Sequence, residues 1–68
     1  MKRKLTNEER AMSKAIAGAF ILAAEECEEA AEAIERDTGI NGEAGSALLK
    51  MAARFREWAV AEEARARS

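Results

Sequence analysis

Seven acidic residues crowd positions 25–37, and their spacing is the feature of this sequence that most suggests chemistry. The pairs Glu25-x-x-Glu28 and Glu26-x-x-Glu29 would lie on adjacent turns of one helix. Carboxylate pairs of this kind can hold Mg²⁺ beside a substrate phosphate. The simpler interpretation is an acidic helix surface in contact with water, which needs no other residues, and we favour it.

The acidic run resembles half of the motif of the all-α nucleotide pyrophosphohydrolases, in which a Glu-Glu-x-x-Glu helix is followed by a helix with a Glu-x-x-Asp pair. The second pair is missing here, because Val60 stands three residues after Glu57 and Arg65 three residues after Glu62. The sequence has no histidine, which excludes Ser-His-Asp and Cys-His sites and the common zinc patterns. We therefore predict a protein that is not an enzyme and that uses no metal or cofactor.

The elements that would position these side chains are two helices joined by a short turn, in a single domain spanning residues 1–68. Thr6 and Glu9 match the capping box that starts a helix, and Gly39 is suited to end one. Asn41 is a suitable N-cap for a second helix. The chain has no proline, and strong helix formers dominate it. The sequence predicts an all-α antiparallel hairpin, with helices over about 7–37 and 42–66 and a turn at 38–41.

Apolar residues recur along both expected helices at helical spacing. In the first helix the steps of 4, 4, 3, 4, 4 and 3 give a period of about 3.67 residues, an eleven-residue pattern. Its members are Met12, Ile16, Phe20, Ala23, Cys27, Ala31 and Ile34. In the second helix the steps of 4, 3, 4 and 3 are typical of a coiled coil. Its members are Ala44, Leu48, Met51, Phe55 and Trp58.

The apolar surface is wider than one hairpin can cover. A 68-residue chain with a single cysteine has no internal disulfide to compensate for a small core, so association is the remaining source of stability. We expect two hairpins to form a homodimeric four-helix bundle, in which Cys27 acts as a small apolar residue. The expected dimer interface consists of Met12, Ile16, Phe20, Ile21, Ala23, Cys27, Leu48, Met51 and Phe55.

Charge is distributed unevenly along the sequence, and its distribution is compatible with two classes of partner, nucleic acid and protein. Residues 1–14 have a net charge of +3 and residues 25–37 a net charge of −6. Lys50, Arg54 and Arg56 could contact phosphate, as in RNA- or DNA-binding hairpin dimers of the plasmid copy-number type. The alternative is ion pairing across the hairpin, because Lys50 and Arg54 are expected to face the acidic half of the first helix. Acidic residues lie among these cations, however, whereas nucleic-acid binders usually have a basic stripe. A larger host protein is the favoured partner, with Trp58, Arg54, Lys50 and Leu22 as candidate binding residues.

One segment resembles a targeting signal but is not expected to act as one. Residues 15–24 are uncharged, yet ten residues are too few to cross a bilayer. Glu8 and Glu9 precede this segment, whereas a signal peptide has a positively charged region there. We predict a cytoplasmic protein without a membrane partner.

In length, composition and expected hairpin architecture, the chain resembles small all-α proteins that bacteriophages encode to inhibit host factors. The quorum-sensing anti-activator type, a two-helix dimer that sequesters a host transcription activator, is the nearest parallel. The resemblance involves no diagnostic motif, so it assigns no functional residue. It implies a protein-binding inhibitor that blocks a host regulator.

Overall fold

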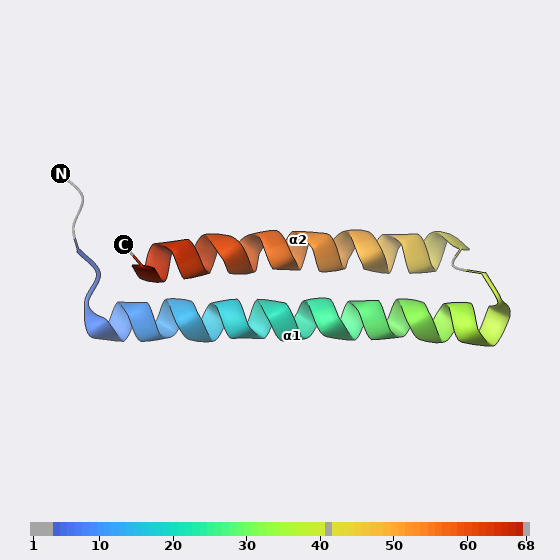
Figure 1. Cartoon of the computed structure of the whole chain (residues 1–68), viewed down its shortest axis with the longest axis horizontal. Helices are drawn as coiled ribbons and strands as arrows, with labels where there is room; N and C mark the ends of the chain where they lie inside the picture. Colours follow the sequence, from blue (N-terminus) through green and yellow to red (C-terminus); the bar gives the residue numbers. More distant parts are fainter. Residues whose placement is uncertain (1–3, 41, 68) are drawn as a thin grey trace.

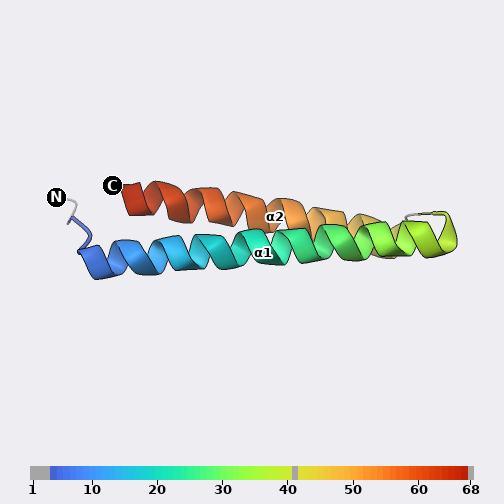
Figure 2. The ribbon, with the colours of Figure 1, turned by 60° about the horizontal axis from the view of Figure 1, so that its bottom comes forward.

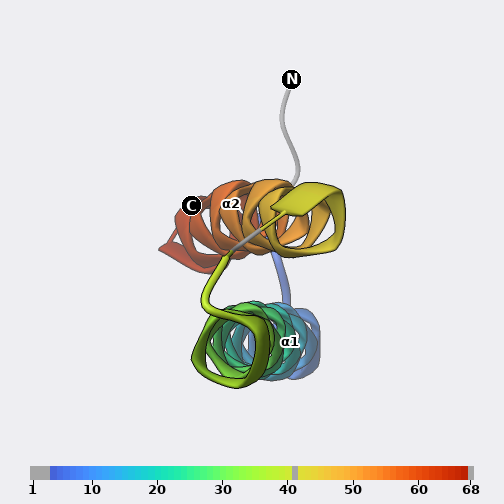
Figure 3. The ribbon, with the colours of Figure 1, turned by 90° about the vertical axis from the view of Figure 1, so that its right-hand side faces the viewer.

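The chain folds as two antiparallel α-helices that lie side by side in one layer (Figure 1). The computed structural model describes residues 4–40 and 42–67, in which α1 spans Asn7–Thr38 and α2 spans Gly42–Arg67. The start of α1 and the end of α2 lie at the same end of the hairpin. Viewed end-on, the described residues contain no third element that covers either side of the pair (Figure 3). The predicted all-α hairpin is confirmed.

Hydrogen bonds at both ends of α1 explain where this helix begins and ends. The Thr6 hydroxyl accepts from the Glu9 backbone N–H at 3.1 Å, and the Thr6 N–H donates to Glu9 Oε1 at 2.9 Å. At the other end Gly39 has a φ of 79°, and its N–H donates to the carbonyl of Glu35 at 2.7 Å. These are the capping box and the left-handed glycine expected from the sequence. The expected N-cap Asn41 lies outside the described residues.

Two glycines allow opposite effects of the same substitution to be predicted. Gly39→Ala is expected to lower the free energy of unfolding by about 1 kcal/mol, because an alanine is strained at positive φ. Gly18→Ala is expected to raise it by about 1 kcal/mol, because Gly18 lies inside α1 with open space at its missing Cβ. Urea denaturation followed by circular dichroism would measure both. Equal shifts of one sign would contradict this account of the turn.

The two helices meet along a seam of small residues, here called the alanine seam. On α1 its buried members are Ser13, Ala17, Ala24 and Ala31, and on α2 they are Gly45, Ala52, Ala59 and Ala66. Ala24 is 0% exposed. The α2 members recur every seven residues, which is the coiled-coil repeat, and Figure 2 shows the helices crossing at a shallow angle. Small side chains allow the two backbones to approach closely along this line.

The alanine seam corrects the expected position of the buried stripe. The residues that α1 buries against α2 are those of the alanine seam, and not those of the expected eleven-residue pattern. Ala31 alone belongs to both sets. Met12 and Ile16 are exposed, as are Met51 and Trp58. Among the described residues, no large side chain is fully buried. The larger apolar residues lie beside the seam, where a single hairpin cannot cover them.

Candidate functional site

Three aromatic rings gather on one side of the alanine seam. The Phe20 ring lies 6.1 Å from that of Phe55 and 5.6 Å from that of Trp58, measured between centroids. Phe55 and Trp58 pack edge to face, also at 5.6 Å. These distances lie within the range of favourable aromatic pairs. Phe20 and Phe55 are half-buried, whereas Trp58 remains 46% exposed. Contacts between the rings therefore link α1 to α2, and each ring keeps part of its surface exposed.

Helical spacing extends this cluster into an apolar surface, here called the aromatic face. Residues three, four or seven positions from an aromatic residue lie on the same side of its helix. Several of them keep a large part of their surface exposed, Met12 (59%) and Met51 (48%) among them. The aromatic face comprises Met12, Ile16, Phe20, Ala23, Cys27 and Ile34 on α1, and Leu48, Met51, Phe55 and Trp58 on α2.

The aromatic face contains eight of the nine residues expected at a dimer interface. Ile21 is the ninth, and it lies on the other side of the alanine seam because it precedes Glu28 by two helical turns. Trp58, a candidate residue for binding a larger partner, contacts both phenylalanine rings and so lies on the aromatic face. Cys27 is half-buried there and forms no disulfide.

Polar side chains bound the aromatic face at the end of the hairpin where α1 begins and α2 ends. A shallow cleft of about 240 Å³ is lined there by Glu9, Met12, Ser13, Ile16, Glu62 and Arg65. Ser13 is 4% exposed, in the row of the seam that is otherwise alanine on α1. Leu48, Phe55 and Glu62 are spaced by seven residues and so lie on the same side of α2. The third position of this series therefore has a carboxylate where the first two have an apolar side chain. The apolar surface therefore ends before the last two turns of α2.

On the opposite side of the seam, here called the polar face, an ion pair between Glu28 and Arg56 joins α1 to α2. Arg56 Nη2 lies 2.7 Å from Glu28 Oε1, and Arg56 Nε donates to Glu28 Oε2 at 3.1 Å. The sequence suggested Lys50 and Arg54 as cations facing the acidic half of α1. Among the described residues, Arg56 is the cation that pairs with Glu28, while Lys50 and Arg54 are exposed.

The hydrogen bonds from Arg56 lower the pKa of Glu28 below its ordinary value. The contribution of this pair to stability is therefore present above the pKa of the unfolded chain and is lost as the pH falls through the lower folded-state pKa. Arg56→Gln is expected to return the Glu28 pKa toward its ordinary value, as measured by carboxyl ¹³C NMR titration. Arg54→Gln is the matched control and should leave the lowered pKa unchanged. An unchanged Glu28 pKa in Arg56→Gln would contradict the bidentate pair.

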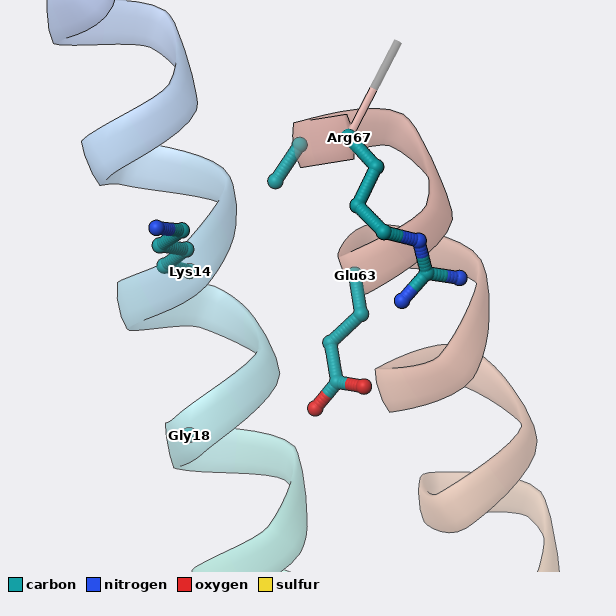
Figure 4. A pocket seen from close by; sticks show the side chains of 5 residues that line it. Lys14, Gly18, Glu63 and Arg67 are labelled. Atoms are coloured by element: carbon teal, nitrogen blue, oxygen red, sulfur yellow. The ribbon is translucent and has the colours of Figure 1, made fainter.

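A second cleft lies on the polar face beside Gly18 (Figure 4). Its volume is about 370 Å³, and it is lined by Lys14, Gly18, Glu63, Ala66 and Arg67. In Figure 4 the Glu63 side chain reaches into the space between the helices, while the Arg67 guanidinium group lies alongside α2. The cleft is shallow and its charges are mixed, so its chemistry indicates no particular ligand.

The acidic run lies on the exposed surface of α1, apart from the half-buried Glu28. No group of three or more Asp, Glu or Cys side chains in residues 4–40 and 42–67 is placed to hold a metal ion. Glu25, Glu26 and Glu29 are exposed, and Glu28 bonds to Arg56. Within the same residues, neither helix offers the uninterrupted apolar length that crossing a membrane requires.

The remaining candidate binding residues lie on the outer sides of the two helices. Leu22 is 64% exposed, and Lys50 and Arg54 are exposed on α2. None of the three belongs to the aromatic face or to the seam. No family model, curated protein or solved structure matches this chain.

Proposed function

We propose that this chain is a non-enzymatic, cytoplasmic protein-binding inhibitor or adaptor that works as a homodimer. The supporting observation is the aromatic face, an exposed apolar surface that runs over both helices. Such a surface on a small helical protein is typical of an interface. In the proposed homodimer two hairpins pack face to face, and the aromatic faces become the core of a four-helix bundle.

The shape of the hairpin supports a second chain. A compact monomer of this mass would expose about 4,200 Å², whereas this chain exposes 5292 Å². Its radius of gyration is 15.7 Å, against about 11 Å for a globular chain of this length. Alanines contribute little apolar area when they are buried, so the seam alone provides a weak hydrophobic driving force. Covering the aromatic face would add the larger side chains to the core.

A partner would then contact the outer sides of the bundle. Leu22, Lys50 and Arg54 stay accessible when the aromatic face is covered, since they lie away from it. An apolar residue and cations of this kind fit a protein surface with an apolar spot and acidic neighbours. The resemblance to phage-encoded inhibitors suggests a bacterial regulator, such as a quorum-sensing transcription activator, as the first target class to test.

Affinity capture from bacterial lysate, with and without nuclease, tests this proposal. A stoichiometric protein that survives nuclease should be lost with Lys50→Glu/Arg54→Glu. It should be retained with Lys14→Glu/Arg36→Glu, a control with the same change of charge on α1. Circular dichroism and light scattering should show that both variants remain folded dimers.

Two outcomes would contradict the inhibitor proposal. Nucleic acid in the captured material, with protein partners lost on nuclease treatment, would favour an RNA- or DNA-binding hairpin dimer, whose affinity falls steeply with salt. Recovery of the tagged chain alone would leave a self-assembling protein.

A further inference from the structure

The aromatic face lies on a side of the hairpin that is large enough for a complete protein interface. The hairpin measures 52 × 19 × 11 Å between Cα atoms, so its broad side is 52 by 19 Å. A standard interface buries about 800 Å² on each partner, which a face of this size provides. The distribution of charge along the hairpin and of side-chain size along α1 makes a second copy of this chain the best-fitting occupant. This inference rests on the homodimer proposed above and specifies how its two copies are arranged.

Two hairpins related by a twofold axis can meet through this face in two ways. If the axis runs along the hairpin, both turns lie at the same end and α1 packs on the partner's α2. If the axis runs across it, the turns lie at opposite ends, and each helix packs antiparallel on its own copy. Both arrangements are closed and isologous, so symmetry does not decide between them.

Charge along the hairpin favours turns at opposite ends. Residues 25–56, the half of the hairpin that contains the turn, hold eight acidic and four basic residues, a net charge of −4. The described residues of the other half, 4–24 and 57–67, hold five acidic and five basic residues and have no net charge. With both turns at one end, two −4 halves would lie together and repel. With turns at opposite ends, each −4 half lies beside a half whose described residues have no net charge.

The sizes of the α1 side chains favour the same arrangement. The large residues Met12, Ile16 and Phe20 occupy the first half of this helix's share of the aromatic face, the small residues Ala23 and Cys27 follow, and Ile34 ends it. Antiparallel pairing of two α1 helices about Ala23, the midpoint of Met12 and Ile34, places Phe20 beside the small Cys27 of the other copy and Met12 against Ile34. Packing α1 on the partner's α2 would instead place Phe20 against the partner's copies of Phe55 and Trp58.

From the charge and size patterns together, we infer that two copies of this chain pair through their aromatic faces with the turns at opposite ends of the bundle. Each α1 then packs antiparallel on the other α1, centred on Ala23. Residues 7–14 of one α1, which have no net charge, then lie along the acidic end of the other.

Spin labels at the turn test this arrangement directly. The full-length chain carries Cys27→Ala, to remove the natural thiol, and Ile40→Cys at the exposed turn. Double electron–electron resonance is expected to give a distance of about 50 Å between labels, since each turn lies about 17 residues from the centre at 1.5 Å per residue. As a matched control, Leu22→Cys in the same background labels the outer side near the centre. It should give a distance on the order of 25 Å from helix packing alone.

The two labels distinguish failure of the orientation from failure of the dimer. An Ile40→Cys distance on the order of 20 Å or less would place the turns together and overturn the orientation, while the homodimer would stand. A monomer mass by light scattering, with no distance at either label, would overturn the homodimer itself. A long distance at the turn with a short one at Leu22→Cys is the result expected.

Discussion

Phe20→Glu is expected to abolish the dimer and leave a chain that is largely unfolded at 25 °C. Phe20 contacts both other aromatic rings and lies at the centre of the proposed dimer core. A carboxylate there loses the packing of the ring and buries an unpaired charge, a loss of about 3 kcal/mol or more. A single core in a chain this small rarely supplies more than about 5 kcal/mol. Circular dichroism melting and light scattering would measure the loss.

Leu22→Glu is the control for this substitution, because it introduces the same charge two residues away on the exposed outer side of α1. Its effect on the free energy of unfolding should stay within about 0.5 kcal/mol, and the dimer should persist. A well-folded Phe20→Glu monomer would show that the aromatic face needs no second copy, and the four-helix bundle would have to be abandoned.

Ala52→Leu is expected to lower the free energy of unfolding by about 2–3 kcal/mol. Ala52 is 2% exposed in the middle of α2, within the alanine seam. A leucine adds three carbon atoms to a site without room for them, and such overpacking forces the surrounding structure apart. The helix propensity of the two residues is similar, so local helix formation does not explain the loss. Urea denaturation monitored by circular dichroism would give the value.

Ala53→Leu provides the matched comparison, because the neighbouring alanine is exposed. Its effect should remain within about 0.5 kcal/mol. If Ala52→Leu and Ala53→Leu proved equally stable, the helices would not meet along the alanine seam, and the stripe of larger residues would be the better candidate for their contact.

The sequence determined the helices and their ends, because these features depend on neighbours in the chain. Thr6 and Glu9 form the capping box that their spacing predicts, and Gly39 takes the left-handed conformation that ends α1. The short connection between two long helices requires an antiparallel hairpin. The sequence also indicated a surplus of apolar surface, which the exposed Met51 and Trp58 display.

Only the tertiary structure decided which side of each helix faces the other. Large residues and alanines both recur at helical spacing, and the larger set was the natural choice for a core because it buries more area. The heptad of Gly45, Ala52, Ala59 and Ala66 was visible in the sequence, yet alanine suits any helix position and so signals burial weakly. The helices meet where their side chains are smallest, and the rings of Phe20, Phe55 and Trp58 are left on one surface. Which side of each helix faces the other depends on how closely the two helices can pack in three dimensions. The spacing of residues along one chain does not determine this.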